Sequence, residues 1–308
     1  MRILFAGTAE IGVLTLRALA ETFEVGLVLT NPDKPKGRSN KLIPSPIKEE
    51  AVKLNLPILQ PERLRGDALK EVASFNCDVL ICFAYGKIFG PKFLSMFKGG
   101  CYNIHPSRLP QFRGSSPIQY AILEGLTSSA ISIQKLGLEV DSGDILSTLD
   151  FEISKKDTTL TLTEKVEAIS APFAVETFKK LEKGEIVVKP QEGDISFTKQ
   201  FTKEDAIIDW NNSASEISAK IRAFTPWPKA YTIYDGQMLF LTSVYDIIDV
   251  SYDVPLGTVV EKRKKQGLVI ACNSGAIIID RLQLQGKKEM DFNSFINGHS
   301  EIISKKLG

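Results

Sequence analysis

Asn103 and His105 are the residues of this sequence whose types and spacing best suit proton transfer and oxyanion stabilisation. They lie two positions apart at the end of an apolar segment that reads as a strand, and Pro106 ends it. Because side chains of a strand alternate between its faces, the amide and the imidazole project from the same side. Both can donate to a developing oxyanion, and the imidazole can also move a proton. A buried histidine satisfied by a neighbouring asparagine fits the same spacing equally well.

Asp141 could supply a carboxylate to this pair. It lies in the sequence GLEVDSGDIL, between apolar runs, and Gly143 follows it. A carboxylate near His105 would favour the imidazolium form of the ring. Asp-Ser-Gly-Asp is equally typical of a plain turn in which an aspartate bonds its own backbone. Spacing alone does not decide between these interpretations.

The first predicted strand-to-helix turn, residues 7–12, lacks the usual nucleotide-binding residues. A dinucleotide fingerprint would have glycine where the chain has Ala9, and a phosphate loop would have lysine directly after Gly12. We therefore expect a tight turn here and no NAD(P).

Histidine and cysteine usage argues against a metal site. The chain has two histidines, His105 and His299, which excludes a cluster of histidine ligands. Its four cysteines form no CxxC pair, so neither a zinc knuckle nor a disulfide framework is indicated. We expect a cytoplasmic protein with reduced thiols and no metal.

Strand-like and helix-like segments alternate through the first half of the chain, which predicts βαβ units and a Rossmann-like α/β sheet of parallel strands. Helices are expected near residues 11–20 and over 159–183. Ligands of such open sheets bind at the carboxyl ends of the strands, where Asn103 and His105 would lie. The six predicted strands cover residues 2–6, 25–30, 57–59, 78–84, 100–105 and 130–135.

A second domain is expected after a linker. Residues 184–203 lose the periodic pattern and contain Pro190 and Gly193. Beyond them, a helix over 214–223 and short alternating segments separated by turns predict a small antiparallel β-barrel, OB-like in type. The expected division is a catalytic domain over 1–183, a linker over 184–203 and a C-terminal domain over 204–308.

Length and composition agree with this division. The chain has 308 residues, about two domains' worth, of which 43% are hydrophobic and 24% charged. The longest stretch without a charged residue, 266–279, contains polar residues and is too short to span a bilayer. A net charge of +1 excludes bulk attraction to nucleic acid, so any polyanion would be met by local patches.

The chain resembles the folate-dependent formyltransferases. That family has an N-x-H pattern followed later by D-x-G, and these fall here on Asn103, His105 and Asp141. The resemblance is more specific to the members that formylate Met-tRNA, and it covers most of the chain. It is carried by NPDKPKGRSNKLIPSPIK (31–48), FAYGKIFGP (83–91), HPSRLPQFRGSSPIQ (105–119), DSGDIL (141–146) and IRAFTPWPKAY (221–231).

The resemblance implies a reaction, a co-substrate and a set of catalytic residues. Asn103, His105 and Asp141 would be catalytic, and the formyl donor would be 10-formyltetrahydrofolate. Part of the folate pocket would be formed by Ser107, Arg108, Leu109 and Pro110. The chain has Arg108 where the family usually has leucine, so the folate contact at this position would differ.

A basic insert over residues 32–42 is a candidate for RNA contact. Composition alone favours a solvated surface loop. The resemblance implies that it enters the acceptor stem of initiator Met-tRNA, with Arg38 as its key arginine, because a guanidinium can both fork onto phosphate and stack on bases. The resemblance likewise makes the C-terminal domain a tRNA-binding domain, and we expect a monomer. The basic residues of the insert are Lys34, Lys36, Arg38 and Lys41.

Three other functions remain open at this point. A sugar or purine formyltransferase would share the catalytic set but would not need the insert or the C-terminal barrel. A nicotinamide dehydrogenase is disfavoured by Ala9. A non-catalytic RNA-binding protein could retain the barrel and the insert, although it would have no need of Asn103, His105 and Asp141.

Overall fold

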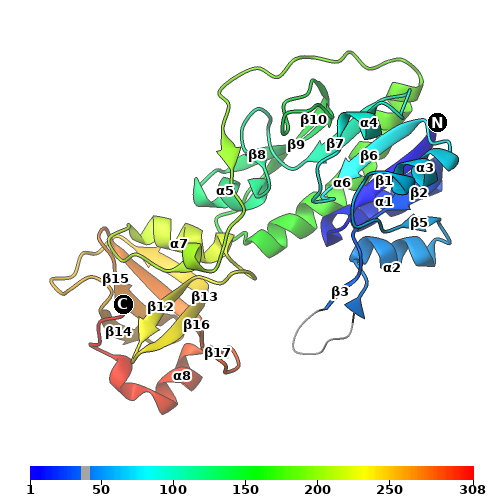
Figure 1. The fold of residues 1–308 in the computed structure, drawn as a ribbon. Coiled ribbons are helices and arrows are strands. Elements are labelled where there is room, and N and C mark those ends of the chain that lie inside the picture. Colours follow the sequence, from blue (N-terminus) through cyan, green and yellow to red (C-terminus); the bar gives the residue numbers. More distant parts are fainter. Residues whose placement is uncertain (36–41) are drawn as a thin grey trace. The chain divides into compact units, whose positions relative to one another are not determined.

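The computed structural model describes residues 1–35 and 42–308. Its chain divides into two compact units (Figure 1). Residues 184–198, from the expected linker, belong to the first unit, and 199–203 belong to the second. The first unit comprises Met1–Pro117, Ser128–Glu152 and Thr163–Thr198, and the second comprises Ile118–Thr127, Ile153–Leu162 and Lys199–Gly308.

A seven-stranded sheet forms the centre of the first unit, as far as the described residues show. The strand order is β10-β9-β7-β6-β1-β2-β5. The five strands from β5 to β7 are parallel, which confirms the prediction of an α/β sheet rich in parallel strands. The strands are β1 (Arg2–Gly7), β2 (Glu24–Leu29), β5 (Ile58–Leu59), β6 (Val79–Phe83), β7 (Cys101–His105), β9 (Ser128–Lys135) and β10 (Ile145–Glu152).

The sixth predicted strand, 130–135, is present, but its expected parallel direction is wrong. It forms β9, but β9 runs antiparallel to β7, and β10, which the sequence did not predict, returns antiparallel to β9. The interior of β9 is buried throughout, so its apolar run looks like that of a parallel strand. Strand direction depends on how the preceding connection returns, which an apolar run does not record.

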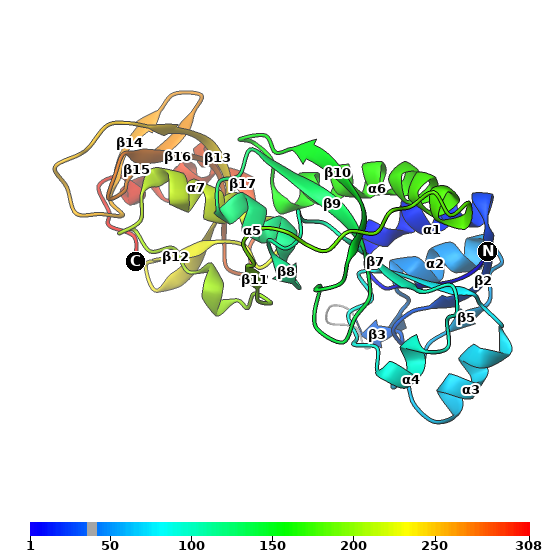
Figure 2. The same cartoon turned by 90° about the horizontal axis from the view of Figure 1, so that it is seen from above.

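Helices cover both faces of the sheet (Figure 2). Leu4, Leu27 and Leu80 belong to a core with the side chains of α3 and α4. On the opposite face, the ring of Tyr102 packs edge-on against Phe178 of α6. These helices are α1 (Val13–Thr22), α2 (Pro46–Lys53), α3 (Asp67–Ser74), α4 (Pro91–Leu94) and α6 (Thr159–Glu182). The sheet is therefore buried on both sides, and its exposed edge at the carboxyl ends of the strands is left for a site.

Two small strand pairs complete the first unit. β3 (Lys34–Pro35) and β4 (Leu42–Ile43) pair antiparallel at the two ends of the basic insert. β8 (Arg113–Gly114) pairs in parallel with β11 (Phe197–Thr198). The second pair ties the segment after residue 184 to the loop that follows β7.

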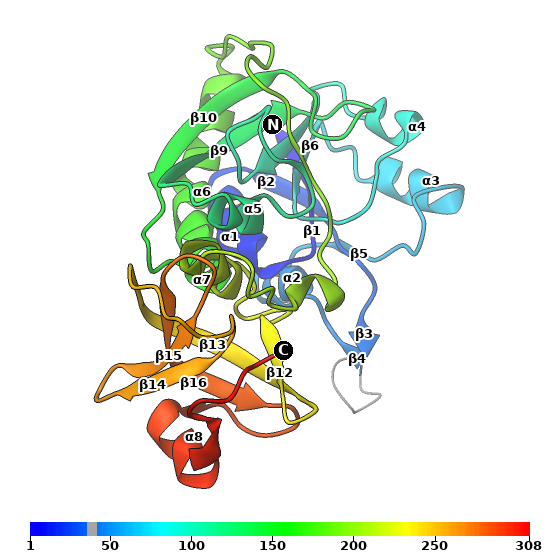
Figure 3. The same cartoon turned by 90° about the vertical axis from the view of Figure 1, so that its left-hand side faces the viewer.

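An antiparallel half-barrel forms the second unit, as predicted (Figure 3). The strand order is β12-β13-β16-β15-β14, and β17 pairs with β16. α7 and α8 bury apolar side chains in the core of this sheet. The elements are α5 (Pro117–Leu123), α7 (Ala214–Ala223), β12 (Tyr231–Tyr234), β13 (Gln237–Ile248), β14 (Val259–Arg263), β15 (Gly267–Ala271), β16 (Ala276–Leu284), β17 (Met290–Asp291) and α8 (Phe292–Gly298).

The last residues of the chain bridge the two edge strands of this sheet. The Val259 amide of β14 donates to the carbonyl of Lys305 at 2.9 Å, and the Gly308 amide donates to the carbonyl of Ile233 in β12 at 3.0 Å. Backbone groups at both edges thus find partners within the unit, and the edges are less open to pairing with other chains.

Local capping explains where several helices begin. The Ser213 hydroxyl accepts a hydrogen bond from the Glu216 amide while the Glu216 carboxylate accepts from the Ser213 amide, which is a capping box at the start of α7. Ser45 caps α2 with its hydroxyl alone, which accepts from the Lys48 amide, and it is followed by Pro46, whose fixed φ suits the first helical position. Asp291 caps α8 by accepting from two backbone amides.

A buried carboxylate joins α1 to α2. Glu50 is 2% exposed and accepts a hydrogen bond from Arg17 Nε at 2.6 Å, and Lys53 contacts its other oxygen at 3.4 Å. The hydrogen bond from Arg17 holds the pKa of Glu50 below its ordinary value, against the opposing effect of burial. The ionised carboxylate therefore stabilises the folded state.

Replacing Glu50→Gln should lower the free energy of unfolding at pH 7 by about 1–2 kcal/mol, less than a fully buried pair would lose because Arg17 is half exposed. A lowered folded-state pKa means that this contribution is complete above the unfolded value of about 4.5 and declines as the pH falls below it. Urea unfolding at pH 7 and pH 4 would measure both effects. The exposed Glu49→Gln is the matched control, and an equal loss at both pH values would contradict the assignment.

Candidate active site

Strand β7 places Asn103 and His105 on one face at the carboxyl edge of the sheet. Asn103 is in register with Cys82 of β6 and with Gln134 of β9, and His105 is in register with Ser132 of β9. Cross-strand partners share a face of the sheet. The predicted alternation therefore brings the amide, the imidazole and the side chain of Gln134 to the same side.

The carboxylate of Asp141 lies where these side chains meet. One oxygen, Oδ1, accepts from Asn103 Nδ2 at 3.2 Å and from Gln134 Nε2 at 2.8 Å. The other, Oδ2, accepts from the Gly114 amide at 2.8 Å and lies 3.6 Å from His105 Nδ1. The structure thus brings the three predicted catalytic residues together, from β7 and from the loop between β9 and β10.

His105 is held between two oxygen acceptors. Its side chain is 5% exposed, its Nε2 lies 2.9 Å from the carbonyl oxygen of Phe112, and its Nδ1 faces Asp141. Since a carbonyl and a carboxylate can only accept, an imidazolium could donate to both. The edge of the ring that carries Nδ1 is the one directed toward Asp141.

The Asp141 loop has a backbone that few sequences could adopt. Asp141 has a φ of 49°, in the left-handed region, where aspartate is better tolerated than most residues. A Cβ atom at Gly143 would lie 1.8 Å from the carbonyl oxygen of Lys135, so this position requires glycine. The residue types at positions 141 and 143 are therefore also suited to the backbone conformation of this loop.

Several residues around Asp141 were missed by sequence reasoning. Gln134 is fully buried, and its polar side chain in an apolar strand was the one available signal. Gln191 donates through Nε2 to the carbonyl oxygens of Asp141 and Gly143, each at 2.8 Å. It comes from the segment expected to be a linker, where nothing in the local sequence marked it.

The predicted folate-binding residues form a tight loop after β7. The Ser107 side chain is fully buried, and its hydroxyl donates to the carbonyl of Gln111 at 2.6 Å. Leu109 is also buried, and its amide lies 3.3 Å from Ser132 Oγ. Arg108 extends outward and pairs with Asp150 of β10. The loop next to His105 is therefore shaped by contacts within the protein, and the arginine is its exposed member.

Of the predicted tRNA-binding residues, Lys34 lies in β3 and is exposed, whereas Lys36, Arg38 and Lys41 lie outside the described residues. The base of the insert is anchored through Asp33, which accepts from Lys48 Nζ at 2.7 Å and from Gln60 Nε2 at 2.8 Å. These hydrogen bonds, the one from Gln60 above all, hold the pKa of Asp33 below its ordinary value.

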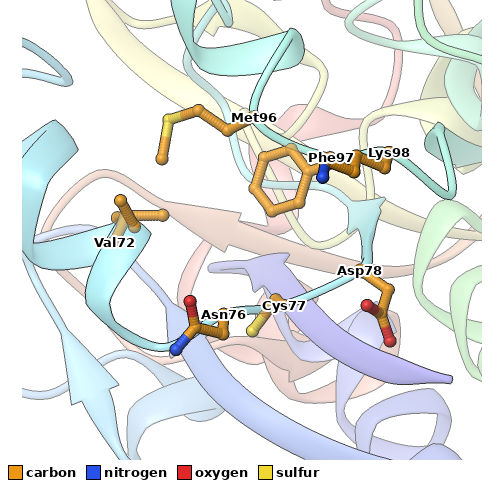
Figure 4. Close-up of a pocket in the computed structure, with 8 residues that line it drawn as sticks. Val72, Asn76, Cys77, Asp78, Met96, Phe97 and Lys98 are labelled. Atoms are coloured by element: carbon orange, nitrogen blue, oxygen red, sulfur yellow. The ribbon is translucent and has the colours of Figure 1, made fainter.

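A cavity of about 400 Å³ lies elsewhere in the first unit (Figure 4). Asp78, which directly precedes β6, is part of its lining, so the cavity is at the amino ends of the strands, opposite the edge that carries His105. Burial raises the pKa of the Cys77 thiol, which disfavours a reactive thiolate there. The lining residues are Val72, Ala73, Asn76, Cys77, Asp78, Met96, Phe97 and Lys98.

Neither a membrane-spanning helix nor a cluster of metal ligands is found in the described residues. No helix in residues 1–35 and 42–308 has the length and apolar character needed to cross a membrane. Within the same residues, histidine, cysteine and acidic side chains form no group of three or more that could hold a metal ion.

A largely parallel α/β unit with an amide, an imidazole and a carboxylate at its carboxyl edge, joined to an antiparallel β unit, defines a two-domain α/β protein with a polar site at the edge of its sheet. Comparison with known proteins gives the particular class. Residues 1–177 match the family described as "Formyl transferase", and residues 200–300 match "Formyl transferase, C-terminal domain". The chain belongs to the formyl transferase family.

Curated relatives match over nearly the full length. A methionyl-tRNA formyltransferase of Coxiella burnetii (strain RSA 331 / Henzerling II) is 39% identical over 304 residues, which are 98% of this chain and 96% of the relative. One from Borrelia hermsii (strain HS1 / DAH) is 38% identical and covers 99% of each chain. Among solved structures, the sugar 3N-formyl transferase WlaRD, in the presence of dTDP and 5-N-formyl-THF, is similar in fold, with a TM-score of 0.66 at 17% identity, covering 94% of this chain and 99% of that one.

Substituting Gly143→Ala should destabilise the first unit by about 1–3 kcal/mol, because the new methyl group would displace the backbone at Lys135. Denaturant unfolding would measure the change. Gly137→Ala, in the same loop, is the matched control, since its added Cβ would meet its nearest atom, Ser142 Oγ, only at 3.8 Å. Equal stability of the two variants would show that the loop tolerates a side chain at residue 143.

Proposed function

We propose that this protein transfers the formyl group of 10-formyltetrahydrofolate to the α-amino group of methionine on initiator Met-tRNA, giving N-formylmethionyl-tRNA for translation initiation. The observation that carries the proposal is the convergence of Asn103, His105 and Asp141 at the carboxyl edge of the sheet. The acceptor is inferred from relatives that are 38–39% identical over 98–99% of the chain and are methionyl-tRNA formyltransferases.

The reaction needs a neutral amine and a polarised formyl group. An α-amino group has a pKa near 8, so a useful fraction is neutral at physiological pH. Its nitrogen attacks the formyl carbon, and the carbonyl oxygen becomes a tetrahedral oxyanion. The bond from that carbon to N10 of the folate then breaks, and the proton lost by the amine is gained by N10. Tetrahydrofolate and the formylated amine are the products, and nothing is oxidised or reduced.

Asn103 and His105 would stabilise the oxyanion. One N–H of the Asn103 amide donates to Asp141 at 3.2 Å, which leaves the second N–H for a substrate oxygen, and His105 Nδ1, which at 3.6 Å from Asp141 is beyond hydrogen-bond distance, would donate to that oxygen as well. A single well-placed donor to an oxyanion is typically worth about 10²–10³ in rate. Both residues lie on a central strand, so little rearrangement is needed when charge develops.

Asp141 would orient His105 and accept the proton of the attacking amine, directly or through a water molecule. Its side chain is 11% exposed, and its oxygens already accept from three N–H groups, which fixes their direction. Acid–base assistance of this kind contributes about 10²–10⁴ in rate. The proton taken from the amine is then passed to N10 as its bond to the formyl carbon breaks. None of these steps calls for a metal or NAD(P), and the proposal includes neither.

The folate is a consumed co-substrate in this proposal, and residues 107–110 form part of its pocket. They follow His105 directly, so a ligand bound against them would lie within reach of the imidazole. Arg108 is the polar side chain of this loop that extends outward, and a guanidinium suits the carboxylates of a folate tail. Its partner Asp150 would then compete with the ligand for Arg108.

For the tRNA, we propose contact through Arg38, Lys34, Lys36 and Lys41, with residues 204–308 as a tRNA-binding domain and 184–203 as the connection to the catalytic domain, 1–183. The ribbon β3–β4 and the Asp33 contacts fix where the insert leaves the first unit. Anionic RNA suits a segment with four basic residues and one acidic residue. The proposed enzyme acts as a cytoplasmic monomer.

Substitution of the three catalytic residues tests the mechanism. Asn103→Ala, His105→Ala and Asp141→Ala should each lower kcat for formylation of Met-tRNA by about 10²-fold or more, because each removes a donor or acceptor used as charge develops. Steady-state kinetics with 10-formyltetrahydrofolate and charged initiator tRNA would measure this. Ser142→Ala, in the same loop as Asp141, is a control. Activity within a few-fold of wild type in all three variants would refute the mechanism.

The tRNA contact is tested by Arg38→Ala and Arg38→Lys. Both should raise KM for Met-tRNA. The alanine variant, which loses the charge as well, should lower kcat/KM about 10-fold or more, whereas lysine retains the charge but cannot fork or stack. The slope of log affinity against log salt should become shallower by about one for alanine. Arg65→Ala, an exposed arginine of the same unit, is the control. Unchanged tRNA kinetics at physiological salt would exclude Arg38 as a contact.

A further inference from the structure

Gln191 is the residue around Asp141 whose contacts the proposed mechanism does not use. Its amide makes hydrogen bonds in two directions, to Arg113 on one side and to the Asp141 loop on the other. It comes from the connecting segment after α6, 50 residues from Asp141 in sequence. These contacts attach the connecting segment to the site through one side chain.

Arg113 fixes which way the Gln191 amide points. The guanidinium donates to Gln191 Oε1 through Nε at 3.1 Å and through Nη2 at 2.7 Å. Because a guanidinium has no acceptor, the oxygen of Gln191 must face Arg113 and its NH₂ group must face the opposite way. Arg113 is 8% exposed, so water competes little for this contact.

The NH₂ group of Gln191 then determines the direction of a second amide. Gln191 Nε2 lies 3.2 Å from Gln134 Oε1, and Gln134 Nε2 donates to Asp141 Oδ1 at 2.8 Å. Since Gln134 is fully buried, its amide cannot exchange these partners for water. Two amides therefore connect a cation to the carboxylate, each with one possible orientation.

Gln191 also holds the backbone of the Asp141 loop. Its two N–H bonds donate to the carbonyl oxygens of Asp141 and Gly143, each at 2.8 Å, and the longer contact with Gln134 Oε1, at 3.2 Å, shares one of these hydrogens. The same side chain thus fixes the main chain on both sides of Ser142 and, through Gln134, one oxygen of the carboxylate. Asp141 has a left-handed backbone, and these two hydrogen bonds hold the main chain in that conformation.

We propose that Arg113, Gln191 and Gln134 form a relay that positions Asp141 against Asn103 and His105, with Gln191 as its essential positioning residue. The inference rests on the proposed function, because it assigns these residues a role in formyl transfer. The segment 184–198 thereby belongs to the catalytic machinery as well as to the connection between the units. Misplacing a reacting group by about 1 Å can cost about 10² in rate, which sets the scale of the effect.

Gln191→Leu, which keeps the volume and removes the hydrogen bonds, should lower kcat about 10- to 100-fold, with KM for the folate and for Met-tRNA within about threefold of wild type. Gln191→Glu keeps the acceptor for Arg113 but loses the NH₂ group, so it should be at least as impaired. Arg113→Lys should retain more activity than Arg113→Met. Gln200→Leu, at an exposed glutamine, is the matched control. Wild-type kcat in Gln191→Leu would overturn the relay.

A double-mutant cycle distinguishes positioning of the Asp141 carboxylate from general stabilisation of the fold by Gln191. If Gln191 acts through the Asp141 carboxylate, Gln191→Leu should cost little further activity in an Asp141→Asn background. Losses that multiply would overturn the proposal.

A readout without turnover keeps this inference distinct from the proposed function. With two histidines in the chain, ring ¹⁵N spectra can be assigned, and Gln191→Leu should shift the His105 signals while leaving those of His299 in place. Unmoved His105 signals would contradict the relay even in an active enzyme. If the wild-type protein cannot formylate Met-tRNA, the proposed function is refuted. The hydrogen-bonded relay would still stand if Gln191→Leu shifts the His105 signals.

Discussion

The candidate site depends on the Asp141 carboxylate being held by hydrogen bonds from several directions. Asn103, Gln134 and the Gly114 amide all donate to it, and His105 faces it at 3.6 Å. A carboxylate that is 11% exposed is costly to bury unless its lone pairs are satisfied. The same contacts that offset this cost also fix the direction of the oxygens, so stability and chemistry depend on the same geometry.

Sheet topology is what brings these groups together. Because β9 runs antiparallel to β7, Gln134 is in register with Asn103, and the loop into β10 returns toward the same face. Asp141 therefore reaches the carboxyl edge of the sheet from a strand whose own carboxyl end points the other way. If β9 were parallel to β7, its carboxyl end would already lie at that edge, so the antiparallel arrangement requires the loop to turn back over the face of the sheet. The antiparallel pair achieves this with a short loop that requires glycine at residue 143.

The segment after α6 extends this arrangement. Residues 184–198 pack with the first unit, where β11 pairs with β8 and Gln191 reaches the Asp141 loop. A loose, polar sequence was expected to be a connection without structure of its own. Backbone pairing and one glutamine side chain are enough to make it part of the site, because each supplies partners to groups that would otherwise be buried without them.

The sequence by itself determined the class of fold, the helix α7 and the five main strands of the second unit, and the three residues that meet at the site. It could do so because strand and helix periodicity is local, because residues 103 and 105 must share a face, and because the motifs around Arg38, His105 and Asp141 identify a family. Tertiary structure alone decided that β9 is antiparallel, that β10 exists beside it, and that Arg113, Gln134 and Gln191 converge on Asp141. These are contacts between residues far apart in the chain, and their energy depends on burial and direction, which no local pattern of residue types records.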